Sequence, residues 1–196
     1  TGCTLLLFRP QEKEPYARLK YPEAYHIGNT FAMLVFGLKI DEFEYAFQLD
    51  GPYDVSRGLL FDKNNVLLDP FAKAVTGQRN WGERPESDEG FVYHARVVEN
   101  NFDWGRMTFP EIPAEDLIIY ETHVRGFTRD ASSGVTAGGT FEGLRQKIPY
   151  LKDLGVNAIE LLPIFEFDEM ESARVVDGVQ LYNYWGYNTV SFFAPN

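Results

Sequence analysis

Two short apolar runs enclose a segment with helical periodicity, and this arrangement constrains the fold more than any other feature of the chain. Residues 117–120 and 156–162 are nearly continuous apolar runs, as expected for strands buried on both faces. Between them, apolar residues recur at helical spacing over residues 141–154. Strand, helix and strand in this order predict a βαβ unit, whose two strands are parallel and joined by a right-handed crossover.

Three residues predict where the helical segment begins, bends and ends. Thr140 is placed to cap the N-terminus, because its hydroxyl can accept a hydrogen bond from a free backbone N–H of the first turn. Pro149 lies inside the repeat and predicts a kink or a break, since proline lacks the N–H that a helix needs. Gly155 predicts the C-terminal end of the helix.

The first hundred residues predict a different architecture, a β-sandwich. Large apolar residues alternate with other residues over 43–49, which indicates a strand with one buried face. Turn-forming residues separate this strand from other segments rich in β-branched and aromatic residues, and short strands at such spacing favour a sandwich. The predicted strands are residues 4–9, 30–38, 44–49 and 90–98. Residues 102–115 contain two prolines and predict a linker.

The charge and the cysteine content of the chain exclude some functions. The sequence has 18 basic and 29 acidic side chains, a formal net charge of −11. Nucleic-acid binding needs clustered basic residues, and an anionic membrane surface would repel the chain, so we expect neither partner. A neutral polysaccharide would not be repelled, although the charge can also serve solubility alone. Cys3 is the only cysteine, which rules out an intrachain disulfide and fits a reducing compartment.

Five blocks of sequence carry a resemblance to a known family. They are DGPYD (50–54), LLDPFAKAV (67–75), IIYETHVRGFT (118–128), GVNAIELLPIFEFDE (155–169) and NYWGYNTVSFFAPN (183–196). In this order and spacing, the sequence resembles the isoamylase-type glycogen debranching enzymes of glycoside hydrolase family 13, the α-amylase family. The first two blocks are similar to the family-48 carbohydrate-binding module that precedes the catalytic barrel of those enzymes.

The resemblance implies a fold in two parts. An immunoglobulin-like β-sandwich, without its first strands, would span residues 1–105, and the first βαβ part of a (β/α)8 TIM barrel would span residues 116–196. The barrel elements would be strand 1 at 117–122, helix 1 at 141–154, strand 2 at 156–162 and a long loop at 165–196. Loops after barrel strands form the active-site face, so this loop should face the substrate. The family's catalytic carboxylates come from later strands, so the resemblance implies a fragment without catalytic residues.

The same resemblance implies a function for the parent enzyme. The family hydrolyses α-1,6-glucosidic branch linkages with retention, through two carboxylates and without an organic cofactor. The partner would be an α-glucan such as glycogen, amylopectin or a limit dextrin, in the cytoplasm or, in a plant, in the plastid. Two alternatives stay open: a non-catalytic α-glucan-binding module, and another α-amylase-family member such as a branching or trehalose-releasing enzyme.

Tyr187, Trp185 and Tyr184 are the candidate substrate-binding residues. Tyr187 matches the aromatic platform of the family for the sugar next to the cut bond. A flat ring suits this role because it covers the apolar C–H face of a sugar and excludes water from it. Trp185 and Tyr184 are interpreted equally well as cleft wall and as core. No residue of the chain is predicted to be catalytic, to bind a cofactor or to bind a metal.

A cluster at the end of the first predicted barrel strand has two interpretations. Glu121, His123 and Arg125 alternate along the chain, and a histidine between a carboxylate and a guanidinium suggests acid–base chemistry. The resemblance favours a structural role instead, in which the cluster supports the barrel mouth through a salt bridge and hydrogen bonds.

The acidic residues after the second barrel strand also have two interpretations. Some family members bind Ca²⁺ near this loop, with ligands at the positions of Glu166 and Asn196, and carboxylates are suitable ligands. Phe167 stands at another ligand position, so we predict a solvated acidic loop and no metal. Elsewhere, Tyr53 and Trp81 are candidate glucan-stacking residues of the sandwich, with bracing of the barrel as the alternative role of that module.

Overall fold

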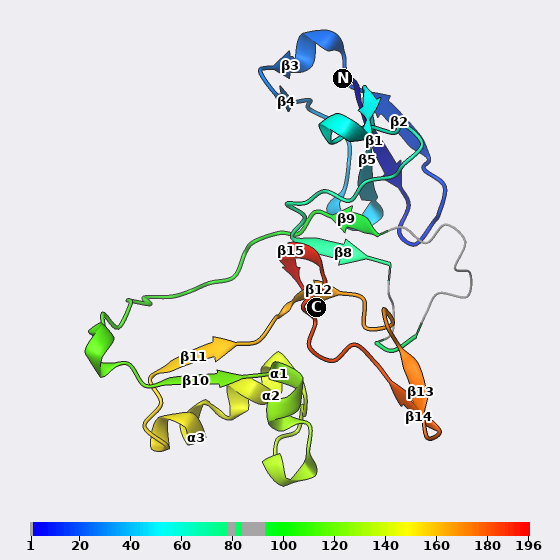
Figure 1. Ribbon diagram of the computed structural model, residues 1–196. Coiled ribbons are helices and arrows are strands. Elements are labelled where there is room, and N and C mark those ends of the chain that lie inside the picture. The colour runs from blue at the N-terminus through cyan, green and yellow to red at the C-terminus, as the bar shows by residue number, and fades with distance from the viewer. Residues whose placement is uncertain (1, 78–80, 84–92) are drawn as a thin grey trace. The chain divides into compact units, whose positions relative to one another are not determined.

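The computed structural model describes residues 2–77, 81–83 and 93–196, whose elements are labelled in Figure 1. By their contacts these residues divide into two compact units. Unit 1 comprises Thr1–Glu99, Phe165–Asn183 and Asn188–Asn196, and unit 2 comprises Asn100–Ile164 and Tyr184–Tyr187. Within the described ranges, no helix has the length and apolar character needed to cross a membrane.

A five-stranded antiparallel sheet forms the centre of unit 1 (Figure 1). Its strands, in spatial order, are β2 (Ala17–Lys20), β1 (Gly2–Phe8), β5 (Glu44–Asp50), β9 (His94–Arg96) and β8 (Ala74–Thr76). The pairing of β1 with β5 runs over the whole of both strands, from Gly2 opposite Asp50 to Phe8 opposite Glu44. The strands predicted at 4–9 and 44–49 are thus confirmed, and 90–92 of the fourth predicted strand lie outside the described residues.

Both faces of β1 and β5 are covered, so the prediction of one buried face is wrong. One cluster of buried side chains consists of Leu5, Leu7 and Phe43, and the other consists of Leu6, Phe8 and Ala46. Glu44, which the alternation placed on an exposed face, is only 2% exposed. A carboxylate can occupy this position because it is paired with His94, whose Nδ1 lies 3.0 Å from Glu44 Oε2.

The rest of the first hundred residues contains only very short elements. The strand predicted over 30–38 is limited to Thr30–Phe31, which pair with His26–Ile27; the Ala32 N–H still donates to the Tyr25 oxygen at 3.1 Å, but the described residues 33–38 form no strand. The short elements are η1 (Glu23–Tyr25), β3 (His26–Ile27), β4 (Thr30–Phe31), η2 (Ile40–Glu42), β6 (Tyr53–Asp54), η3 (Val55–Arg57) and β7 (Leu59–Leu60). Unit 1 is thus mostly strand and loop.

Residues 165–196 are not a simple loop, and that prediction is wrong. They contain β12 (Phe165–Phe167), β13 (Arg174–Val176), β14 (Val179–Leu181) and β15 (Thr189–Pro195). β13 and β14 form an antiparallel hairpin, and β12 pairs with β15 with two shifts of register. β15 also packs within unit 1, since Phe193 stacks on Phe71 with ring centroids 5.4 Å apart. The β-branched and aromatic residues of β15 favour this extended pairing.

Unit 2 contains the predicted parallel strand pair. The strands β10 (Ile119–Thr122) and β11 (Ala158–Leu161) are parallel, with Ile119 opposite Ala158. The elements around them are η4 (Ala114–Asp116), α1 (Val124–Thr128), η5 (Ala131–Ser133), α2 (Phe141–Gln146) and α3 (Ile148–Asp153). The predicted burial of both strand faces is wrong for this pair, because a two-stranded sheet leaves Ile119 56% and Ile159 40% exposed.

The ends of the helical segment agree with the sequence. The Thr140 hydroxyl accepts a hydrogen bond of 3.1 Å from the Gly143 N–H and caps α2. The segment breaks at Lys147, so that α3 begins just before Pro149, where the missing N–H of proline is tolerated. Gly155 follows the last turn with φ of 91°, a conformation that glycine adopts without strain.

Replacing Thr140 with alanine should destabilise α2 by about 1 kcal/mol, because the Gly143 N–H would lose its acceptor. The matched control is Thr140→Ser, which retains the hydroxyl and should exchange like the wild type. Hydrogen exchange of peptides covering α2 is the measurement. Equal exchange in the alanine and serine variants would show that the cap does not stabilise this helix.

Candidate functional site

The three candidate substrate-binding residues lie together in Tyr184–Tyr187, which we call the aromatic segment. The contacts of this segment assign it to unit 2, whereas the residues on either side of it belong to unit 1. Its rings are accessible: Tyr184 is 39% exposed, Trp185 53% and Tyr187 69%. Gly186 has φ of 72°, and this left-handed turn separates Tyr187 from the two rings before it.

His123 connects the end of β10 to the aromatic segment. It is the N-cap residue of α1, and its Nδ1 accepts a hydrogen bond of 3.1 Å from the Gly126 N–H. Because Nδ1 is the acceptor, the ring proton of a neutral imidazole lies on Nε2. Nε2 lies 2.9 Å from the backbone oxygen of Tyr184 and donates to it. Both ring nitrogens are therefore occupied by backbone partners.

The rings around His123 form a small stack. The Tyr184 ring lies over the imidazole, with centroids 4.3 Å apart and an interplanar angle of 16°. The Trp185 ring forms T-shaped contacts with both rings, with its centroid 5.8 Å from that of His123 and 5.2 Å from that of Tyr184. Tyr184 and Trp185 thus contribute to packing as well as to the surface, and Tyr187 presents the most exposed ring.

This geometry bears on the two interpretations of His123. It favours the structural interpretation, since both ring nitrogens hydrogen-bond to backbone groups. The salt bridge expected for Glu121 and Arg125 stays a prediction. The link to Tyr184 could not be predicted from local sequence, because the two residues are 61 positions apart.

The acidic residues after β12 are held by protein donors, and the prediction of a solvated loop is wrong for Glu169. Its side chain is buried, and its Oε1 accepts from the Gly82 N–H at 2.6 Å. Asp168 Oδ1 accepts from the Met170 N–H at 2.9 Å, and Glu171 accepts from the side chain of Asn188. In the described part of the chain, no group of acidic, histidine or cysteine side chains is arranged to hold a metal ion.

Glu166 has a strongly perturbed carboxyl group. The pKa of Glu166 is raised to about 7, mainly by burial; a hydrogen bond from the Asn196 amide lowers it, and the nearby charges of Glu169 and Asp168 add to the increase. Asn196 Nδ2 lies 3.2 Å from Glu166 Oε1. The two residues for which the resemblance implied calcium-ligand positions, Glu166 and Asn196, thus bind each other here.

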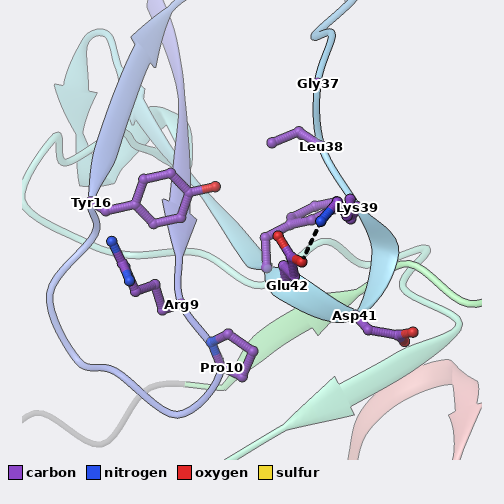
Figure 2. A pocket seen from close by; sticks show the side chains of 9 residues that line it. Arg9, Pro10, Tyr16, Gly37, Leu38, Lys39, Asp41 and Glu42 are labelled. Carbon is purple, nitrogen blue, oxygen red and sulfur yellow. Dashed lines mark hydrogen bonds and ion pairs between the residues drawn. The ribbon is translucent and has the colours of Figure 1, made fainter.

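Unit 1 has a groove of about 510 Å³ beside the turn that follows β1 (Figure 2). Its lining residues are Arg9, Pro10, Tyr16, Gly37, Leu38, Lys39, Asp41, Glu42 and Phe43. Figure 2 shows Arg9 and Tyr16 on one side, opposite Lys39 and Glu42, whose Nζ and Oε1 are 2.8 Å apart. Tyr16 is 47% exposed, so one aromatic ring and paired charges are available in the groove.

The other aromatic candidates of unit 1 differ in accessibility. Tyr53 is 66% exposed, next to Asp54, which caps η3 by accepting from the Ser56 N–H at 3.1 Å. Trp81 packs against Tyr182 with centroids 4.9 Å apart, so part of its ring is covered. Tyr53 therefore fits a stacking role better than Trp81.

Comparison with curated proteins gives a consistent set of homologues. The chain is 42% identical to isoamylase 3, chloroplastic, of Oryza sativa subsp. japonica over 172 residues, which are 86% of this chain and 22% of that protein. It is 32% identical to the glycogen debranching enzyme of Serratia proteamaculans (strain 568), over 100% of this chain and 30% of that protein. The chain spans between 20% and 30% of the length of the curated relatives it matches. No protein-family model matches it.

Solved structures show the same relationship at the level of the fold. A pullulanase type I from Bacillus subtilis str. 168, crystallised with maltose, matches 100% of this chain and 25% of its own, at a TM-score of 0.69 and 24% identity. An apo pullulanase from Paenibacillus barengoltzii matches 100% of this chain and 28% of its own, at a TM-score of 0.73 and 20% identity. The homologues of this chain are thus isoamylases and glycogen debranching enzymes, and its mostly-strand fold matches part of the pullulanases.

Proposed function

We propose that this chain is part of an enzyme that hydrolyses α-1,6 branch linkages of an α-glucan, and that the aromatic segment contributes to its substrate-binding surface. The observation that carries the proposal is the accessible ring of Tyr187, on a segment fixed to the end of β10 through His123. The names of the relatives, which include isoamylases and glycogen debranching enzymes, support the reaction.

The proposed domains follow from the same relationship. Residues 1–105 would be a family-48-type β-sandwich, and residues 116–196 would begin a (β/α)8 barrel with β10 and β11 as its first two strands. The parallel pairing of β10 and β11 supports this assignment, because antiparallel strands cannot begin such a barrel. The exposed apolar side chains of β10 are also expected for strands whose neighbours come from elsewhere in a longer protein.

The proposed role of the aromatic segment is binding rather than chemistry. A tyrosine ring covers the C–H face of a glucose unit and removes water from it, which fixes the sugar without a charge. The catalytic carboxylates are assigned to later barrel strands, and no residue of this chain is proposed as catalytic. The proposal includes no organic cofactor and places the enzyme in the cytoplasm or, as for the relatives named chloroplastic, in a plastid.

Tyr187→Ala should weaken binding of maltoheptaose by roughly tenfold, since the sugar would lose its stacking surface. Isothermal titration of the 196-residue chain is the measurement. The matched control is Tyr150→Ala, which removes a 52% exposed tyrosine of unit 2 outside the aromatic segment. Equal affinity of the Tyr187→Ala and Tyr150→Ala variants would contradict the platform role.

The reaction itself is tested on the protein extended to the length of its relatives. A debranching enzyme should release linear maltooligosaccharides and new reducing ends from amylopectin. A branching enzyme would release no net reducing ends, and a trehalose-releasing enzyme would produce trehalose, so the products separate the three members of the family.

A non-catalytic α-glucan-binding module is the second candidate, and the groove beside Tyr16 favours it. The groove combines an accessible ring with Arg9, Lys39, Asp41 and Glu42, whose charges balance and which can hydrogen-bond to sugar hydroxyls. In the same titration, a loss of affinity in Tyr16→Ala and none in Tyr187→Ala would favour this candidate over the first.

A further inference from the structure

The aromatic segment is held by side chains that lie far from it in the sequence. Its polypeptide neighbours on both sides belong to unit 1, yet its four residues belong to unit 2. Within unit 2, His123 holds the segment through the Nε2 hydrogen bond and the ring stack on Tyr184, and through the edge contact with Trp185. The conformation of the segment therefore depends on His123 as well as on its own sequence.

Gly126 provides the second contact with Tyr184. A Cβ added to Gly126 would lie 2.3 Å from the Tyr184 hydroxyl oxygen but 3.6 Å from the ring carbon Cζ. The first distance is a clash and the second is an ordinary van der Waals contact. A side chain at residue 126 would thus force the Tyr184 hydroxyl to move, and the Gly126 N–H also holds His123 in place.

We propose that His123 is a positioning residue that, together with Gly126, fixes the aromatic segment in the conformation that presents Tyr187 to the substrate. His123 holds the backbone oxygen of Tyr184, and Gly126 leaves room for the Tyr184 side chain. The left-handed turn at Gly186 then sets the direction of Tyr187 relative to this fixed point. The consequence for substrate binding depends on the proposed function, whereas the positioning itself does not.

The two contacts can be broken separately. His123→Ala removes the hydrogen bond and the stack, and Gly126→Ala introduces the clash with the Tyr184 hydroxyl. Both should accelerate hydrogen exchange of a peptide covering residues 184–189 by roughly tenfold, which is the factor expected for one net hydrogen bond or one local clash. The control is His26→Ala, which removes a histidine of unit 1 that also stacks on an aromatic ring, Phe31.

A double variant makes the test specific. Tyr184→Phe removes only the hydroxyl that collides with the added Cβ, so the Gly126→Ala/Tyr184→Phe chain should regain exchange within about threefold of the wild type. A merely destabilised α1 would not be rescued by a change at residue 184. Unchanged hydrogen exchange in His123→Ala, or no rescue in the double variant, would overturn the inference. The double variant still gives this test if His123→Ala fails to fold.

Maltoheptaose titration of the same variants separates this inference from the proposed function. If the wild type binds the sugar, His123→Ala and Gly126→Ala should weaken binding by roughly fivefold to tenfold, and the double variant should recover it. If the wild type binds no glucan but the exchange pattern follows the prediction, the positioning stands and the proposed function fails. Binding that is unaffected although the segment has become mobile would overturn the link between positioning and substrate.

Discussion

Replacing Glu44 with alanine should destabilise unit 1 by about 1–3 kcal/mol, the cost of leaving a buried hydrogen-bonding group without its partner. The Glu44 side chain is 3% exposed and that of His94 is 9% exposed, so neither can be rescued by water. Glu44 Oε2 lies 3.0 Å from His94 Nδ1, and its Oε1 accepts from the Gln11 N–H at 3.2 Å. Both donors would lose their acceptor in the variant.

The position of this pair in the sheet explains why its loss should be global. Glu44 lies at the end of β5, the central strand, and His94 lies on the neighbouring β9. The imidazole also stacks on Phe8 of β1, with ring centroids 3.8 Å apart. The pair therefore joins three adjacent strands of the sheet through buried contacts.

The same pair makes unit 1 sensitive to acid. Burial raises the pKa of Glu44, but hydrogen bonds from His94, Thr76 and the Gln11 N–H outweigh it, and the pKa lies below 4.5. A carboxyl group whose pKa is lowered by folding stabilises the fold above its unfolded pKa. That contribution is lost as the pH falls below about 4.5 and through the lower folded value.

Hydrogen exchange of peptides covering β1 and β5 measures this stability at pH 7 and, after correction for the intrinsic rate, at pH 4. The matched control is Glu42→Ala, which removes a carboxylate two residues away. Its ion pair with Lys39 is 66% exposed at Glu42 and is screened by water, so its loss should change the stability little. Equal losses in the two variants would show that the buried pair does not hold the sheet.

Local patterns in the sequence were sufficient for the two strands and the helical segment of unit 2, although not for α1. The helical repeat, the Thr140 cap, Pro149 and Gly155 act over one or two turns, so they could be interpreted without a partner. The burial of β10 could not be predicted in the same way. An apolar strand in a two-stranded sheet stays exposed, and its apolar character alone does not tell how many neighbours it has.

Contacts between distant residues account for the predictions that failed. Glu44 was assigned to an exposed face because its partner His94 is 50 positions away. Residues 165–196 were predicted as a loop because β12 pairs with β15 across more than twenty intervening residues, a pairing that no local turn signals. The aromatic segment was identified from its residue types, but its attachment to His123 required the structure.

Glu166 should have the opposite effect on the pH dependence of unit 1. Its folded pKa of about 7 lies above the unfolded value of 4.5, so the folded state favours the protonated carboxyl. Below pH 4.5 the carboxyl group is protonated in both the folded and the unfolded state, so it does not lower the stability of the fold. As the pH rises from 4.5 to above 7, the folded state must accept a partly buried carboxylate beside Glu169 and Asp168, and stability falls.

A shift of this size corresponds to about 3 kcal/mol at most, and the partial exposure of Glu166 reduces the expected loss to about 1–2 kcal/mol. Glu166→Gln keeps a neutral side chain at every pH, so it should be more stable than the wild type by that amount at pH 8 and equal to it near pH 4.5. The measurement is urea unfolding, monitored through hydrogen exchange of peptides that cover β12 and β15. Glu12→Gln, an exposed carboxylate of unit 1, is the control. If the wild type were as stable as Glu166→Gln at pH 8, the Asn196 hydrogen bond alone would be sufficient to hold the ionised carboxylate in place.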